Sequence, residues 1–155
     1  MKLFELKREL CLPISLDESW AFFSNPRNLA LITPPSLNLK PVGEVPEAMF
    51  TGLVLSYNVR PFLGVQSTWI TEITHVEKPF RFVDEQRFGP YKFWHHTHEF
   101  EATNRGVRTI DTVRYLLPFD PFSRVAIPIV RRQLEWIFAY RTDSLTARFG
   151  ALENR

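Results

Sequence analysis

The stretch KFWHHTHEFEATNRGVRTIDTVRYLL, residues 92–117, decides the fold, because its residue types alternate on both sides of one turn. Side chains of a strand point in turn to the two faces of its sheet, so this alternation predicts two half-buried strands. Residues 104–106, Asn-Arg-Gly, are typical of a turn. Pairing Ala102 with Val107 across that turn gives an antiparallel hairpin with one largely apolar face.

The apolar face of this predicted hairpin also carries polar side chains. On the first strand His96 and His98 share a face with Trp94, whereas His95 points to the opposite face. The register places His98 directly opposite Asp111, with the two Cβ atoms about 5 Å apart. An inward-facing carboxylate is unfavourable unless it is paired. We therefore expect Asp111 to be buried beside a partner, and His98 is the nearest one.

Three other polar residues are candidates for the same cluster. Arg8 falls on the apolar face of the first predicted strand and is a second potential partner for Asp111. Asp84 and Gln86 share a face with the apolar residues of the predicted strand 80–88. We expect both side chains to lie near Asp111.

This polar cluster is open to three interpretations. It can be a structural network of buried polar groups, it can orient a ligand without catalysis, or His98 and Asp111 can act as an acid/base pair. A metal site of His96, His98 and Asp111 is conceivable, because alternate residues of a strand can reach one ion. A single His-x-His is weak evidence, and the sequence offers no firm fourth ligand. We expect neither a metal nor another cofactor.

The rest of the sequence predicts strands before this hairpin and one long helix after it. The expected earlier strands are 3–12, 37–43, 51–60, 65–76 and 80–88. Two short helices follow the first strand, one capped by Ser15 or Asp17 and the other over residues 26–32. Apolar residues at three/four spacing predict a helix within 121–149, with Pro128 at a kink or in its first turn.

This order of elements predicts the α+β class and a single domain over residues 1–155. A long amphipathic helix needs an apolar partner, and one face of the sheet is the only large candidate. We expect an antiparallel, curved sheet of six or seven strands gripping a long C-terminal helix. Aromatic residues make up 14% of the chain and can line the space between sheet and helix.

Composition and charge exclude several classes of protein. The chain has 155 residues, 45% of them hydrophobic, and a net charge of only +2, which is too small for a strong nucleic-acid-binding surface. No apolar run approaches the roughly 20 residues of a membrane span. The single cysteine, Cys11, cannot form an internal disulfide. We expect a cytoplasmic protein without nucleic-acid binding or integral membrane association.

The element order resembles the helix-grip fold of the SRPBCC superfamily, which includes START domains, birch-pollen-allergen-like proteins and polyketide cyclase/dehydrase-like proteins. The most specific stretches are FVDEQRFGPYKFWHHTHEFE at 82–101 and DTVRYLLPF at 111–119. With Trp-x-Thr at 69–71 and Ile-Phe-Ala-Tyr-Arg at 137–141, they look like the bacterial ligand-binding SRPBCC proteins. This resemblance implies an apolar cavity for a lipid, steroid, polyketide or similar molecule.

The expected function is binding or carriage of a hydrophobic small molecule between sheet and helix. The candidate ligand-binding residues are Trp69, Thr71, Asp84, Gln86, Trp94, His96, His98, Asp111, Tyr115, Phe138 and Arg141. Phe88 and Tyr140 are further candidates for the cavity lining, and Arg141 can hold either a ligand carboxylate or an acidic residue of the sheet. Two alternatives stay open. One is a cyclase/dehydratase-type enzyme using His98 and Asp111, and the other is an interaction domain with a filled core.

Overall fold

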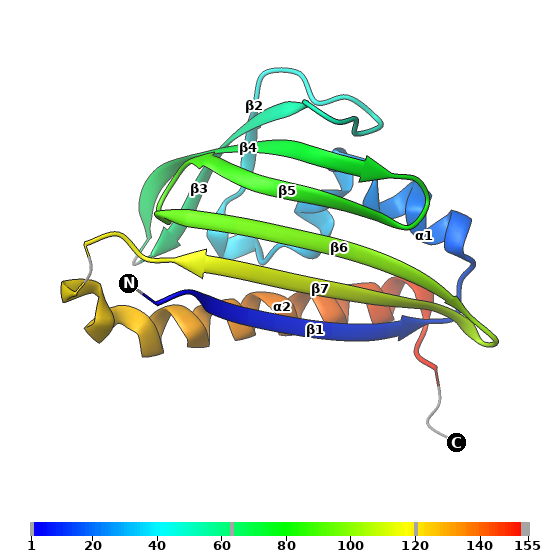
Figure 1. The fold of residues 1–155 in the computed structure, drawn as a ribbon. Helices are drawn as coiled ribbons and strands as arrows, with labels where there is room; N and C mark the ends of the chain where they lie inside the picture. Colours follow the sequence, from blue (N-terminus) through cyan, green and yellow to red (C-terminus); the bar gives the residue numbers. More distant parts are fainter. Residues whose placement is uncertain (1, 63, 120, 153–155) are drawn as a thin grey trace.

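A computed structural model describes residues 2–62, 64–119 and 121–152. The elements in chain order are β1 (Phe4–Leu12), α1 (Leu16–Phe23), η1 (Pro26–Ile32), η2 (Pro35–Leu37), β2 (Lys40–Val42), β3 (Val54–Phe62), β4 (Val65–Glu77), β5 (Arg81–Phe88), β6 (Phe93–Thr103), β7 (Gly106–Leu116), η3 (Phe122–Ala126) and α2 (Ile127–Phe149), where η denotes a 3₁₀ helix. Figure 1 shows α2, in orange to red, running along β1 and β7. The α+β class predicted from the sequence is confirmed.

The strands of the described residues form one antiparallel sheet of seven strands in the order β1-β7-β6-β5-β4-β3-β2. The predicted register of the deciding hairpin is confirmed, since Ala102 pairs with Val107 and His98 pairs with Asp111. The first strand of the chain pairs with the last one, which places Arg8 opposite Asp111. Three adjacent strands, β5, β6 and β7, therefore present the predicted polar residues side by side.

Helix α1 begins at a capping box. The Ser15 side chain accepts a hydrogen bond from the Glu18 backbone N–H, and the Glu18 carboxylate accepts one from the Ser15 N–H. Of the two predicted caps, Ser15 is therefore the one used. The second predicted helix is the 3₁₀ helix η1, where the Asn25 side chain accepts from the Arg27 N–H.

Helix α2 follows η3 directly, and Pro128 lies in its first turn, where a proline removes no helical hydrogen bond. Its buried residues are Val130, Leu134, Phe138, Arg141 and Leu145. Their spacing of three or four puts them on one face of the helix, which packs against the sheet. Among the described residues, no helix has the length and apolar character needed to cross a membrane.

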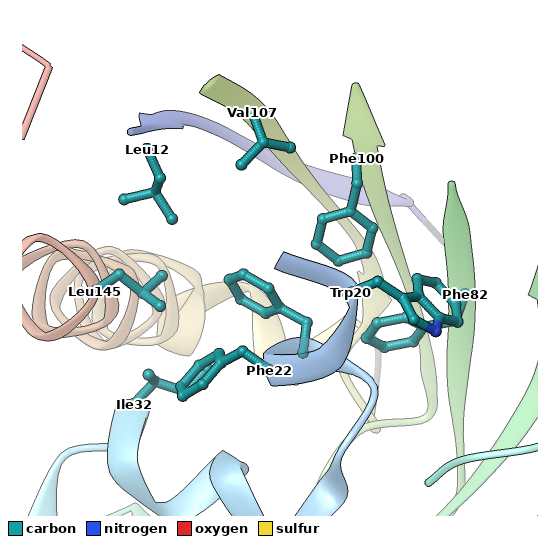
Figure 2. Close-up of a cluster of buried hydrophobic side chains, with 9 residues drawn as sticks. Leu12, Trp20, Phe22, Ile32, Phe82, Phe100, Val107 and Leu145 are labelled. Atoms are coloured by element: carbon teal, nitrogen blue, oxygen red, sulfur yellow. The ribbon is translucent and has the colours of Figure 1, made fainter. Parts of the chain in front are cut away.

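One end of the space between sheet and helices is filled by large side chains (Figure 2). We call this group the aromatic core, and its residues are Leu12, Trp20, Phe22, Phe23, Ile32, Phe82, Phe100, Val107 and Leu145. Trp20 of α1 packs edge-to-face on Phe100 of β6, with ring centroids 6.0 Å apart. It packs in the same way on Phe82 of β5 at 6.1 Å. The aromatic core joins both α-helices to the sheet.

Candidate functional site

Next to the aromatic core lies a group of five ionisable side chains, which we call the polar cluster. Its members are Asp84 on β5, His96 and His98 on β6, Asp111 on β7 and Arg141 on α2. The Oδ1 atom of Asp111 lies 2.8 Å from His96 Nε2, 3.0 Å from His98 Nδ1 and 3.1 Å from Arg141 Nη1. The predicted contact between His98 and Asp111 is confirmed, on the side of the sheet that faces α2.

The second carboxylate, Asp84, faces the other edge of both imidazoles. Its Oδ2 atom lies 2.7 Å from His98 Nε2 and 3.5 Å from His96 Nδ1. The two imidazole rings lie against each other with centroids 3.7 Å apart and planes tilted by 35°, and Phe82 stacks on His98 at 4.1 Å. Each histidine is thus held between two carboxylates and against another ring.

Burial and charge decide the protonation of the polar cluster. Burial by itself raises the pKa of Asp111, but Arg141 and the two imidazoles hold that pKa well below its usual range. Burial lowers the pKa of His98, but the hydrogen bonds to Asp111 and Asp84 outweigh it and raise the pKa. Burial and the neighbouring His98 lower the pKa of His96 to about 4. The surrounding charges therefore favour the ionised form of both carboxylates, whose pKa values are lowered, and they favour protonation of His98 over protonation of His96.

Two expected members lie outside this cluster. Arg8 points along the edge of the sheet, where its guanidinium donates to the Lys7 carbonyl and lies 3.9 Å from Glu135 Oε1. Because β1 is an edge strand, this long side chain reaches solvent and does not turn in toward Asp111. Gln86 donates to the Tyr91 carbonyl and accepts from the Tyr91 N–H, so its amide closes the turn between β5 and β6.

Arg141 takes the place that Arg8 was expected to fill. Of its two predicted roles, the structure has the pairing with an acidic residue of the sheet. Asp111 and Arg141 are 30 positions apart in the sequence, so no local pattern links them. Only the packing of α2 on the sheet brings the two charges together.

A cavity of about 200 Å³ lies beside the polar cluster, between the sheet, η1 and α2. The predicted site residues that line it are Trp69, Thr71, Asp84, Trp94, His96, His98, Phe138 and Arg141. Three predicted site residues are not in its wall, namely Gln86, Asp111 and Tyr115. Gln86 is held at the turn, while Asp111 lies behind the two histidines and Tyr115 behind the wall residue Trp94.

Two further expected lining residues lie elsewhere. Phe88, at the end of β5, is 62% exposed, because its strand ends at the turn. Tyr140 is half-buried on α2, outside the cavity wall. Tyr57 of β3, which pairs with Trp69, is one of several wall residues that were not predicted from the sequence. The buried alternation of Leu55, Tyr57 and Val59 is the signal that could have found it.

The cavity wall contains hydrogen-bond donors without a partner. Tyr57 Oη, Trp94 Nε1 and Arg141 Nε are buried and make no hydrogen bond with any described residue. Burial, helped by Asp84, raises the pKa of Tyr57 to about 12, so its hydroxyl remains a donor at neutral pH. Buried polar groups are normally paired in folded proteins. All three residues line the same cavity, so a bound molecule that reached these atoms would supply the missing partners.

Comparison with solved structures identifies the architecture. The chain matches protein CV1439 from Chromobacterium violaceum with a TM-score of 0.69 and 12% identity, over 97% of this chain and 98% of that one. It matches ginseng major latex-like protein 151 from Panax ginseng with a TM-score of 0.67 and 13% identity, over 95% and 97%. The fold is a helix grip. No family model and no curated protein matches the sequence.

The helix grip is also shared with Ara h 8.0201, with a TM-score of 0.63 and 13% identity over 94% of this chain and 99% of that one. At these identities the likeness is one of fold. Each match spans nearly the full length of both chains, so the likeness extends over the whole fold. The helix-grip fold that the predicted order of elements implied is therefore confirmed.

Proposed function

We propose that this helix-grip protein binds a small apolar molecule, without covalent chemistry, in the cavity between sheet and α2. One observation carries the proposal: the cavity combines a largely apolar wall with three buried donors that lack a partner. Sites for small molecules have this character, with apolar walls that give affinity and a few polar groups that fix orientation.

The size of the cavity narrows the class of ligand. A dry protein cavity of about 150 Å³ holds benzene, and drug-sized ligands occupy about 300–1,000 Å³. The cavity here measures about 200 Å³. This volume supports a molecule with one substituted ring, or a short acyl chain, in preference to a steroid or a long-chain lipid.

The unpaired donors indicate what the ligand carries. A buried donor that lacks a partner destabilises the folded protein by about 1–3 kcal/mol. An oxygen acceptor at one end of the ligand, such as a carbonyl or carboxylate, would offset part of that penalty. The proposed ligand is therefore a small apolar compound with an oxygen acceptor near Tyr57, Trp94 and Arg141.

The two alternatives have less support from this geometry. For a cyclase/dehydratase-type enzyme the acid/base pair would be His98 and Asp111, but both nitrogens of His98 already face carboxylates. Asp111 itself lies outside the cavity wall. An interaction domain with a filled core fits the aromatic core but leaves the cavity without a role.

The motifs at 82–101 and 111–119 also support a narrower placement among the bacterial ligand-binding SRPBCC proteins.

Native mass spectrometry of protein purified from its own host tests whether the protein carries a bound ligand. A bound compound of low mass, released on denaturation, is the expected result. A mass equal to that of the bare chain in every preparation counts against a resident ligand.

A matched pair of probes tests the acceptor directly. Acetophenone and ethylbenzene have nearly the same shape, but only acetophenone carries a carbonyl oxygen. We expect wild-type protein to bind acetophenone about 5- to 10-fold more tightly, the equivalent of one hydrogen bond. Isothermal titration should show this advantage shrinking in Tyr57→Phe.

A substitution that fills the cavity tests whether the probes bind there. Ile137 lines the cavity, whereas Ile129 is 66% exposed on the same helix. Ile137→Phe should abolish the rise in melting temperature that either probe causes, and Ile129→Phe should leave it unchanged. If wild type binds neither probe, or Ile137→Phe binds them as wild type does, the proposed function is wrong and the filled-core interaction domain replaces it.

A further inference from the structure

Three side chains on the cavity wall have the arrangement of a metal site. The nitrogens His96 Nδ1 and His98 Nε2 face the same atom, Asp84 Oδ2, at 3.5 and 2.7 Å. The ligand atoms of these three residues all lie within 4.8 Å of one another. In tetrahedral zinc sites, bonds of about 2.0–2.1 Å place neighbouring ligand atoms about 3.3 Å apart. Small side-chain movements would let all three atoms reach one ion.

The second carboxylate supports the histidines from behind. Asp111 Oδ1 lies 2.8 Å from His96 Nε2 and 3.0 Å from His98 Nδ1, the nitrogens that face away from Asp84. An ionised carboxylate only accepts hydrogen bonds, so both nitrogens donate to it. Arg141 holds Asp111 in place at 3.1 Å. Metal-binding histidines characteristically donate their other N–H to such a carboxylate, which fixes the ring and its tautomer.

The position of the group relative to the cavity gives the third argument. Asp84, His96 and His98 line the cavity, but Asp111 does not. Three protein ligands with an open side are typical of metal sites that also bind a small molecule, whereas structural sites are closed by four. Two imidazoles and one carboxylate suit a divalent transition-metal ion such as Zn²⁺ better than Mg²⁺ or Ca²⁺.

We infer that Asp84, His96 and His98 bind one divalent transition-metal ion at the cavity wall, with Asp111 and Arg141 as its outer support. The ion would replace the hydrogen bond between His98 and Asp84. Its open coordination position would face the ligand cavity. No metal was expected from the sequence, because a single His-x-His is weak evidence and no firm fourth ligand was found. Asp111 was the third ligand considered there, whereas in the structure Asp84 faces both histidines.

The test uses the full-length chain, stripped of metal with EDTA and dialysed. Isothermal titration with Zn²⁺ should show one equivalent bound, and the melting temperature should rise with Zn²⁺ and fall back with EDTA. With Co²⁺, a d–d absorption spectrum of a four- or five-coordinate ion is expected. X-ray absorption of the zinc-loaded protein should show scattering from imidazole ligands.

Four variants locate the ion. His96→Gln and Asp84→Asn each remove a ligand, so Zn²⁺ affinity should fall more than in Asp111→Asn, where loss of outer support lowers it about 10- to 100-fold. His95→Gln is the matched control, because His95 lies on the same strand and faces the opposite side of the sheet, 3.9 Å from Glu85. It should bind Zn²⁺ as wild type does.

Two results overturn the inference. One is a wild-type protein that binds no stoichiometric Zn²⁺ or Co²⁺, and the other is a bound zinc without imidazole scattering or with unchanged affinity in His96→Gln. The absorption spectra need only wild type, so an unstable variant does not prevent the test. The acetophenone titration is performed on EDTA-stripped protein, so failure of metal binding and failure of the proposed ligand binding are observed separately.

Discussion

The two ends of the space between sheet and α2 are built from the same strands but differ in how they are filled. Phe82 and Phe100 belong to the aromatic core, where Trp20 of α1 packs edge-to-face on both. Asp84 and His96, from the same two strands, belong to the polar cluster beside a cavity of about 200 Å³. Phe82 also lines the cavity, so the closely packed region forms one wall of the hollow one. Two to four residues along a strand separate its phenylalanines from the members of the polar cluster.

The difference indicates which end stabilises the fold and which end is available for binding. In the aromatic core every large ring has apolar neighbours, so burial contributes directly to stability. At the other end, charged groups are satisfied mainly by one another, and replacing such a network by apolar residues is often neutral for stability or better. The polar cluster and the cavity therefore stabilise the fold less than apolar packing of the same space would, as is expected of a functional site.

The largest predicted effect comes from removing a ring from the aromatic core. Phe100 is 3% exposed in the aromatic core, so Phe100→Ala should lower the free energy of unfolding by about 3–5 kcal/mol. Phe88, which is 62% exposed, is the control, and Phe88→Ala should change it by less than about 1 kcal/mol. Urea denaturation measures both. Equal losses would contradict the stabilising role of the aromatic core.

The second prediction concerns the buried ion pair. Arg141→Met leaves Asp111 with only the two imidazoles as partners, so the free energy of unfolding should fall by about 2 kcal/mol. Arg114 makes a surface pair with Glu5 at 2.8 Å, and Arg114→Met should cause a loss of less than about 1 kcal/mol. Urea denaturation in low and high salt compares them. A larger loss for Arg114→Met would overturn this ranking.

The smallest predicted effect concerns Tyr57, an unpaired donor of the cavity wall, and it tests directly whether the hollow end stabilises the fold. Tyr57→Phe removes a buried hydroxyl without a described partner, so the free energy of unfolding should stay unchanged or rise by up to about 1 kcal/mol. Tyr115→Phe is the matched control, because the Tyr115 hydroxyl interacts with Arg131, and it should lose about 1 kcal/mol. Thermal and urea unfolding measure both. A clear loss in Tyr57→Phe would mean that its hydroxyl stabilises the empty protein.

The sequence predicts the sheet well because its signals are local. The alternation in residues 92–117 and the turn at 104–106 determine one register, and that register places His98 against Asp111. Gln86 was misplaced because alternation gives the face of a residue but not the turn that captures its amide.

The rest of the site depends on contacts between distant segments. Arg141 reaches Asp111 only through the packing of α2, and Arg8 points to solvent because β1 is an edge strand. A cavity and its unpaired donors are properties of the packed side chains, and no residue pattern in one strand encodes them. Asp84 and Asp111 were both expected at the ligand site, and only the packed structure shows that Asp84 lines the cavity and Asp111 does not.

The pairing of β1 with β7 has a consequence for biosynthesis. The Thr109 hydroxyl donates to the Leu10 carbonyl, a contact between residues 99 positions apart. At a synthesis rate of about 5–20 residues per second, β1 leaves the ribosome roughly 5–20 s before the strand that completes it. During that interval its backbone donors and acceptors are open to chaperones or to other nascent chains, and closure of the sheet must wait for β7.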